Sequence, residues 1–133
     1  MHRDIKVENV LVSDLTCEAK VFLADFGSAI KLNSPLESTS FRVGTPGYIA
    51  PEVIKGEPYS FSCDVWSLGC LLYVLLTATP PLWDSDRKVR EQRVCHEELD
   101  LRSHAYTRRL SEPCQDLLNL LLEKDPALRP DIA

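Results

Sequence analysis

Features that define several common classes of protein are missing from this 133-residue sequence. The net charge is −5, and the 15 basic residues are scattered apart from two short runs, 87–90 and 108–109, which we assign to solvated helix faces. A nucleic-acid-binding surface needs a basic patch, so no nucleic-acid partner is expected. The five cysteines form no C-x-x-C pair and are odd in number, which favours reduced thiols over disulfides. We therefore expect a cytoplasmic or nuclear protein.

Long apolar runs are absent as well. A bilayer-spanning helix needs about 20 apolar residues, and the most apolar stretch here, Leu68–Leu76, is shorter. The start of the sequence has no apolar core of a secretory signal, so we expect neither a signal peptide nor a membrane partner. The apolar residues of Leu68–Leu76 occupy every face of a helix, which is typical of a helix buried in the middle of a domain.

What is present predicts one α+β domain that is mainly α-helical. Two runs rich in β-branched and apolar residues, 10–12 and 20–24, predict a small β-hairpin. The segment 25–51 is rich in Gly, Ser, Thr and Pro and has no sustained period, which indicates a functional loop. The periodicity predicts three helices: a buried helix over 61–79, a charged surface helix over 84–98, and an amphipathic helix over 111–124 with Ser111 as N-cap. A further helix is expected to begin near position 131.

The segment from His2 to Asn9 carries side chains suited to phosphoryl transfer. Moving a γ-phosphoryl group requires alignment and charge neutralisation more than covalent chemistry. Asp4 can accept a hydrogen bond from the attacking hydroxyl, Lys6 can bind the transferring phosphate, and the Asn9 amide oxygen can ligate Mg²⁺. Their spacing on an irregular loop allows all three to converge. For this octet alone, a polar turn before a strand is the alternative.

A second short motif, Asp25-Phe26-Gly27, follows the second predicted strand directly. We expect Asp25 to reach Mg²⁺, Phe26 to pack into the core, and Gly27 to let the chain turn. A three-residue match is weak by itself. The order and distance of the two motifs reinforce each other.

Together these motifs resemble those of the C-terminal lobe of a eukaryotic protein kinase. Three later segments extend the resemblance: Gly44–Glu52 resembles the peptide-docking loop with its Ala-Pro-Glu end, Asp64–Gly69 the start of the central helix, and Leu128–Pro130 the segment of the late arginine. The resemblance covers essentially the whole chain. It implies a partial kinase domain over residues 1–133, from the catalytic loop to the late C-terminal lobe.

The resemblance implies a role for each matching residue. Asp4 is expected to be the catalytic base or to orient the hydroxyl, Lys6 to contact phosphate, and Asn9 and Asp25 to bind Mg²⁺, with ATP as the other cofactor. Lys6 together with Thr45 resembles the serine/threonine branch. The Gly-Thr-Pro-Gly-Tyr segment and 79–84 most resemble the calcium/calmodulin-dependent group. The expected substrates are proteins.

Other positions are expected to bind substrate or to support the site. The substrate-binding positions implied are Glu8, Thr45, Pro46 and Ile49, and the structural or regulatory positions implied are His2, Arg3, Phe26, Gly27, Glu52, Asp64 and Arg129. Among these, Glu52 is expected to pair with Arg129, and Asp64 to hydrogen-bond the backbone of the catalytic loop. Glu8 either reads a basic substrate residue or serves as scaffold.

Arg3, next to Asp4, implies control by phosphorylation of the 25–51 loop, because a guanidinium pairs well with phosphate. The candidate acceptors are Ser34, Ser38, Thr39 and Ser40. In the family the favoured acceptor lies three residues before the glycine of Gly-Thr-Pro, and that position here is Phe41. A merely polar loop is the alternative.

The parts of a kinase that hold ATP are missing from these 133 residues. The five glycines are too far apart for a G-x-G-x-x-G loop, and the strand lysine that binds ATP is absent. Negligible activity is therefore expected from the chain alone. The N-terminal lobe and a helix that packs beside the central helix in the family are also missing. We expect an apolar face of the central helix to be open, and to favour a partner or the missing lobe.

Three interpretations follow. The first is a serine/threonine kinase represented by a fragment. The second is a short binding module that docks partners through 44–52 and the central helix without catalysis. The third is a regulatory pseudokinase. The intact Asp4, Asn9 and Asp25 favour the first, since a docking remnant has no chemical need for them.

Overall fold

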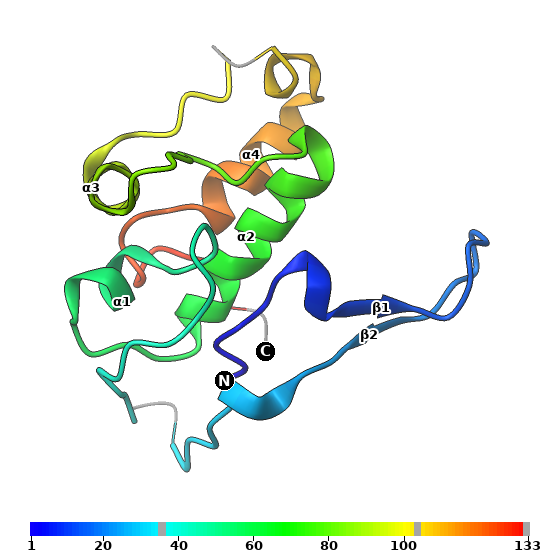
Figure 1. The fold of residues 1–133 in the computed structure, drawn as a ribbon. Coiled ribbons are helices and arrows are strands. Elements are labelled where there is room, and N and C mark those ends of the chain that lie inside the picture. The colour runs from blue at the N-terminus through cyan, green and yellow to red at the C-terminus, as the bar shows by residue number, and fades with distance from the viewer. Residues whose placement is uncertain (35–36, 103–104, 132–133) are drawn as a thin grey trace.

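The computed structural model describes residues 1–34, 37–102 and 105–131 and has a mixed α+β fold dominated by helices (Figure 1). The elements in order are a 3-10 turn Val7–Asn9, strands β1 (Val10–Val12) and β2 (Val21–Leu23), a 3-10 turn Phe26–Ser28, helices α1 (Pro51–Lys55), α2 (Ser62–Thr77) and α3 (Arg87–His96), a 3-10 turn Thr107–Arg109, and helix α4 (Glu112–Leu121). The predicted hairpin and the three predicted helices are confirmed. The expected helix near position 131 falls largely on 132–133, which lie outside the described residues.

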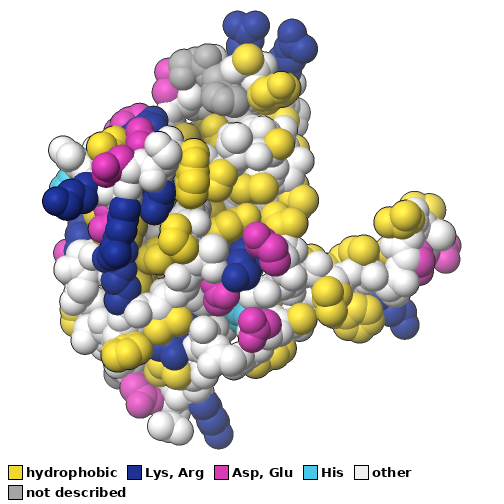
Figure 2. Space-filling view, viewed as in Figure 1, with side chains coloured by type: hydrophobic (Ala, Val, Ile, Leu, Met, Phe, Trp, Pro, Cys, Tyr) yellow, Lys and Arg dark blue, Asp and Glu magenta, His cyan; other side chains and the backbone are white. Residues whose placement is uncertain are grey.

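The hairpin of β1 and β2 projects away from the helices as an arm (Figure 1). Its strands are antiparallel, with Val10 opposite Leu23 and Val12 opposite Val21. All three side chains of β2 are exposed, and Val21 is 67% exposed. Apolar side chains therefore cover much of the arm in the space-filling view (Figure 2). An isolated two-stranded hairpin is marginally stable in water, so its attachment to the helical part is what orders it.

Helix α2 is the central helix, packed against α4 and against the 3-10 turn that precedes β1. Trp66 and Cys70 of α2 are 2% and 1% exposed, and Leu118 of α4 is 0% exposed. Gly69 lets the two helices approach closely, because a Cβ at this position would lie 2.9 Å from the Cβ of Leu121. Within the described ranges, none of the helices has both the length and the apolar character to cross a membrane.

One face of α2 is open. Leu68 and Leu75 are 37% and 67% exposed, and Leu117 of α4 is 45% exposed. These side chains belong to an apolar cleft of about 420 Å³, the leucine groove, lined by Leu68, Leu71, Leu72, Leu75, Leu117, Leu121 and Pro130. The prediction of burial on every face is therefore wrong for this face, because no described segment covers it. The prediction of an open apolar face is confirmed.

Helices α3 and α4 begin in different ways. The Asp86 carboxylate caps α3, accepting hydrogen bonds from Lys88 N at 2.7 Å and from Val89 N at 3.1 Å. Ser111 occupies the N-cap position of α4, but its side chain makes no capping hydrogen bond. Pro113 in the first turn lacks an N–H group, so one donor fewer needs a cap. The predicted N-cap position at Ser111 is therefore confirmed, although its hydroxyl does not cap the helix.

The loop between Phe26–Ser28 and α1 is irregular, as predicted, and is fixed at a few points. Thr39 and Tyr59 exchange two backbone hydrogen bonds, with N–O distances of 3.0 and 2.8 Å. Farther along, Ser67 Oγ of α2 donates to the carbonyl of Tyr48 at 2.8 Å. These contacts hold the 44–52 segment against the start of α2. Helix α1, which ends the segment, is too short for periodicity to predict.

Candidate active site

Asp64, near the start of α2, fixes the backbone of the loop at residues 2–4. Its carboxylate accepts a hydrogen bond from His2 N at 2.7 Å and another from Arg3 N at 2.8 Å. Asp64 is 8% exposed, so both bonds are shielded from water. Arg3 has a φ of 68°, a left-handed conformation that costs a non-glycine residue energy. The two hydrogen bonds stabilise the strained backbone at Arg3. The predicted hydrogen bonding between Asp64 and the loop backbone is confirmed.

His2 ties the loop to the end of β2. Its Nδ1 accepts a hydrogen bond from Asp4 N at 3.3 Å, so the ring proton lies on Nε2, which is 3.0 Å from the carbonyl of Ala24. The ring also meets Phe26 edge-on, with centroids 4.9 Å apart. Both ring nitrogens are thus used within the protein. These contacts agree with the expected supporting role of His2, which stays a prediction.

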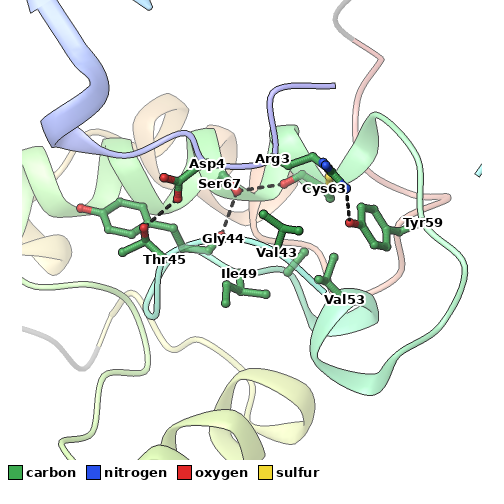
Figure 3. A pocket seen from close by; sticks show the side chains of 12 residues that line it. Arg3, Asp4, Val43, Gly44, Thr45, Ile49, Val53, Tyr59, Cys63 and Ser67 are labelled. Atoms are coloured by element: carbon green, nitrogen blue, oxygen red, sulfur yellow. Dashed lines mark hydrogen bonds between the residues drawn. The ribbon is translucent and has the colours of Figure 1, made fainter. Parts of the chain in front are cut away.

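Asp4, Lys6 and Thr45 form a closed triangle of polar contacts. Thr45 Oγ1 donates to Asp4 Oδ1 at 2.7 Å, and Lys6 Nζ lies 2.8 Å from Thr45 Oγ1 and 3.0 Å from Asp4 Oδ2. Figure 3 shows Asp4 and Thr45 facing each other across the pocket, joined by a dashed line. The sequence predicted a role for each residue but not the contacts among them. The 41 residues that separate Asp4 from Thr45 explain why spacing gave no sign of this contact.

The surroundings of Asp4 determine its charge. Partial burial by itself would raise the pKa of the carboxyl, but the hydrogen bonds from Thr45 and Lys6 and the positive charge of Lys6 outweigh it. The pKa of Asp4 therefore lies below its ordinary value, and the group is a carboxylate at neutral pH. A carboxylate with a lowered pKa is a good hydrogen-bond acceptor and a weak net proton acceptor. Of the two predicted roles, orienting a hydroxyl fits this environment better.

Asn9 and Asp25 flank the two strands. Asn9 is 6% exposed, and its Nδ2 donates to the Asp4 carbonyl at 2.8 Å, which leaves its amide oxygen for another partner. The Asn9 carbonyl accepts a hydrogen bond from Ala24 N at 2.8 Å, and Asp25 follows directly. The exposed Asp25 carboxylate uses Oδ1 to accept a bond from Gly27 N at 3.1 Å. Strand pairing thus brings the two predicted metal ligands to the same end of the hairpin.

This donor set fits a magnesium ion that arrives with its nucleotide. Within the described residues, no group of three or more His, Cys, Asp or Glu side chains could hold a metal by itself. Mg²⁺ is usually bound by one or two carboxylates together with waters and substrate phosphates. One amide oxygen from Asn9 and one carboxylate from Asp25 match that requirement. A resident structural ion would need more ligands.

One expectation for the second motif is wrong. Phe26 is 64% exposed and does not pack into the core; it rests on the edge of His2 instead. The left-handed residue of the turn is Asp25, with a φ of 58°, rather than Gly27. A Cβ at Gly27 would lie 3.1 Å from Asp25 Oδ1, so this glycine makes room for the carboxylate. A three-residue motif does not specify which segments cover its side chains.

Glu52 and Arg129 form a buried ion pair with two parallel contacts. Arg129 Nη1 lies 2.7 Å from Glu52 Oε1, and Nη2 lies 2.8 Å from Oε2. Glu52 is 2% exposed and Arg129 is 7% exposed. The guanidinium also donates to the carbonyls of Ser62 at 2.9 Å and Glu123 at 2.7 Å. The expected pair is confirmed, and it joins α1 to α2 and to the segment after α4.

The predicted substrate-binding residues differ in exposure and position. Pro46 is exposed and Ile49 is partly buried on either side of the buried Tyr48. Glu8 is exposed in the 3-10 turn before β1. Burial raises the pKa of Tyr48, and the negative charge of Glu8 adds to this effect, which places Glu8 near that ring. Of the four predicted residues, Thr45 and Ile49 line the same small pocket as Asp4 (Figure 3).

Arg3 contacts the loop that was predicted to be phosphorylated. Its Nε donates to the carbonyl of Ser28 at 2.6 Å, and its Nη1 lies 3.5 Å from the hydroxyl of Tyr59. That hydroxyl in turn donates to the carbonyl of Phe41 at 2.6 Å. Tyr59 is a contact that the sequence analysis missed. Phosphorylation at Ser34, Ser38, Thr39 or Ser40 stays a prediction.

The scaffold and the site first define a class of protein. The central helix α2 accepts, through Asp64, a hydrogen bond from the backbone of a loop that carries an aspartate, a lysine and an asparagine. This loop contacts the Gly-Thr-Pro segment, which is fixed by a buried ion pair. Such an arrangement is that of a kinase-like protein. The chain belongs to the protein kinase domain family, whose model matches residues 1–133.

Two curated relatives are protein kinases by name, and the name of the second specifies a serine/threonine kinase. Calcium/calmodulin-dependent protein kinase type II subunit delta from Oryctolagus cuniculus is 38% identical over 129 residues, which cover 97% of this chain and 24% of that protein. Serine/threonine-protein kinase PLK4 from Danio rerio is 40% identical over 134 aligned positions, which cover 100% of this chain and 13% of that protein. The chain thus spans a quarter or less of the length of these relatives. Because the two sequence identities are similar, membership of the calcium/calmodulin-dependent group stays a prediction.

Proposed function

We propose that the chain is the part of a serine/threonine protein kinase domain that runs from the catalytic loop to the late C-terminal lobe, and that the whole domain, of which this chain is a part, transfers the γ-phosphate of ATP to protein Ser and Thr hydroxyls. The observation that carries this proposal is the triangle of Asp4, Lys6 and Thr45. It keeps one carboxylate ionised, oriented and next to a cation, and a phosphoryl acceptor needs such a group beside it.

In this proposal each residue acts through a contact that it already makes. The Asp4 carboxylate accepts the hydrogen bond of the substrate hydroxyl, as it now accepts that of Thr45. Lys6, which neutralises Asp4, supplies positive charge to the transferring phosphate. Mg²⁺ bound with ATP neutralises the phosphates, and Asn9 and Asp25 supply oxygen ligands to it. Alignment and charge then account for the chemistry.

We also propose that the 133-residue chain by itself transfers phosphate at a negligible rate, because it contains no G-x-G-x-x-G segment to cover the phosphates. A chimera tests the function. In it, this chain replaces the matching segment of the calcium/calmodulin-dependent relative. We expect the chimera to phosphorylate Ser/Thr peptides of a diverse library with Mg-ATP, and Asp4→Ala to lower the rate about 100-fold or more. Asp116→Asn, an exposed change on α4, is the matched control.

A non-catalytic docking module or pseudokinase is the second candidate, and the leucine groove favours it. Exposed apolar patches of this kind commonly mark contact surfaces. The chimera separates the two candidates. A chimera that folds and binds Mg-ATP but transfers no phosphate to any peptide of a diverse library would support the second candidate and contradict the first.

Two further proposals concern the surroundings of the chain. We propose that the leucine groove is covered by an apolar helix, either from the nucleotide-binding lobe of a kinase domain or from a protein partner. We also propose a cytoplasmic or nuclear location, since all five cysteines are free thiols and a reducing compartment keeps them so. Cross-linking from a cysteine placed at exposed Leu75, followed by peptide mapping, would identify the segment that covers the groove.

A further inference from the structure

A cleft of about 320 Å³ lies between the Gly-Thr-Pro segment, α1 and α3. Apolar side chains line part of it, among them Ile49, Ile54 of α1 and Val94 of α3. Its charged lining residues are three arginines, Arg42, Arg87 and Arg90, and one glutamate, Glu91. We name it the arginine cleft. In the space-filling view, basic side chains gather at the left, over the position of α3 in Figure 1 (Figure 2).

The charges of the arginine cleft are unbalanced. Arg42 and Arg87 both contact the same oxygen, Glu91 Oε1, and Arg87 Nε lies 2.7 Å from it. The hydrogen bond from Arg42 is the main reason why the pKa of Glu91 is lowered, so this carboxylate is ionised at neutral pH. One carboxylate cannot neutralise three guanidinium groups. Two positive charges are thus in excess in the lining of the cleft.

Arg90 is held in place more firmly than the other two arginines. It is 9% exposed, and its Nη1 donates to the carbonyl of Asp84 at 2.7 Å. Its guanidinium carbon lies 4.6 Å from the ring centroid of Trp83. A cation fixed by a backbone carbonyl and an aromatic ring loses little conformational entropy when an anion binds. The cleft therefore combines apolar surface with a fixed positive charge.

The position of the arginine cleft relates it to the catalytic loop. Gly44, Pro46 and Ile49 line it, and Thr45, which lies between the first two, contacts Asp4 at 2.7 Å. A peptide with its hydroxyl at Asp4 would therefore bring neighbouring residues into the cleft. Glu8 lies elsewhere, near Tyr48, and contributes a negative charge. The two surfaces thus differ in sign.

We propose that the arginine cleft binds an acidic segment of the protein substrate, close in sequence to the residue that is phosphorylated. An apolar side chain of that segment contacts Ile49, Ile54 and Val94, and a carboxylate beside it contacts the arginines. This inference rests on the proposed kinase function, because it defines the class of substrate for that same site. The excess of positive charge is what argues for carboxylate rather than for a neutral or basic segment.

Binding of non-phosphorylatable peptides to the 133-residue chain tests this inference without ATP. Alanine replaces the acceptor serine, and a Leu-Glu pair is placed at successive positions on either side. Matched peptides carry Leu-Gln or Leu-Lys. Fluorescence anisotropy is expected to show the tightest binding for Leu-Glu at one position, about fivefold over Leu-Gln, with the advantage falling as salt is raised. Equal binding of the three peptides would overturn the proposal.

Two substitutions on the surface of α3 locate the effect. Arg87→Gln removes a charge from the lining, and its side chain is 70% exposed, so folding is not at risk. Lys88→Gln removes the same charge from an exposed neighbour that does not line the cleft. We expect Arg87→Gln, but not Lys88→Gln, to reduce the advantage of the Leu-Glu peptide. The Leu-Lys peptide is expected to bind Arg87→Glu more tightly than it binds the parent chain. Equal effects of Arg87→Gln and Lys88→Gln would contradict the assignment.

Failure of this inference and failure of the kinase function give different results. If peptides bind with the expected preference while the chimera transfers no phosphate, the cleft assignment stands and the proposed catalysis falls. If the chimera is active and its peptide substrates show no preference for acidic residues near the acceptor, the catalysis stands and the cleft assignment falls.

Discussion

Asp4 lies in an environment that differs from that of a free side chain in solution. Three groups influence it: the apolar surroundings that bury it, the Thr45 hydroxyl, and the Lys6 ammonium. The hydroxyl and the ammonium prevail, and the carboxylate stays ionised. The same two side chains orient it, so charge and geometry have a common origin.

The first prediction concerns the titration of Asp4. A carboxyl-detected NMR titration is expected to give a pKa below the ordinary 3.8. Thr45→Val and Lys6→Met should each raise the pKa, because each removes a group that favours the carboxylate. The ionised carboxylate therefore stabilises the fold at pH values above the unfolded-state pKa of Asp4. This contribution is lost as the pH falls through the lower folded-state pKa. Asp116→Asn should leave the Asp4 titration unchanged, and a pKa above 3.8 in the parent chain would contradict the geometry.

The buried pair of Glu52 and Arg129 gives the second prediction. Glu52→Gln leaves the guanidinium buried without its counter-charge, and such a change costs about 3–5 kcal/mol. Glu97→Gln breaks the exposed pair with Arg93, which contributes at most about 1 kcal/mol. In urea unfolding, Glu52→Gln should therefore lose several times more unfolding free energy than Glu97→Gln. Similar midpoints for both would show that the buried pair does not hold the fold.

At the scale of elements, periodicity predicted what depends on neighbouring residues. The helices and the hairpin each have their signal within a few turns of sequence, and all of them are confirmed. The contact between Glu52 and Arg129 spans 77 residues and follows from family resemblance, not from any pattern in the sequence. Phe26 was placed wrongly, because a motif names a residue but not the segments that cover it.

The arginine cleft shows why other parts of the site could not be predicted. Its lining comes from the Gly-Thr-Pro segment, α1 and α3, which are far apart in the sequence. Arg87 and Arg90 were assigned to a solvated helix face, and Arg42 lies in a loop without periodicity. Tertiary contacts bring these parts together: α1 packs against α3, and Arg42 pairs with Glu91 of α3. A site of this kind depends on tertiary contacts that no local signal encodes.

The contact between α2 and α4 gives the third prediction. Gly69→Ala places a Cβ 2.9 Å from Leu121 Cβ and from Leu122 Cδ2. Overpacking of this kind costs about 1–3 kcal/mol, which exceeds the gain of about 1 kcal/mol in helix propensity at its upper end. We expect net destabilisation of up to about 2 kcal/mol by thermal or urea unfolding. Leu75→Ala, on the open face of the same helix, should change stability less; a more stable Gly69→Ala would show that the helices can separate freely.

At the scale of the whole molecule, the exposed apolar surface of the described residues includes the hairpin arm (Figure 2) and the leucine groove. The two surfaces favour association by different interactions. The hairpin presents two strand edges, and unpaired edges associate through backbone hydrogen bonds. The groove presents side chains of α2 and α4, whose burial is favourable by about 25 cal/mol per Å². Substitution of groove side chains can therefore separate the two routes to association.

The leucine groove gives the last prediction. The chain alone is expected to self-associate at micromolar concentration, as measured by sedimentation velocity. The double change Leu75→Lys and Leu117→Lys should shift it towards monomer, because both side chains are exposed and their replacement leaves the core intact. Leu15→Lys, at a fully exposed leucine between the two strands, is the matched control and should shift it less. If Leu15→Lys alone restores the monomer, the hairpin drives association. A parent chain that is monomeric throughout would show that the open face of α2 is tolerated in water.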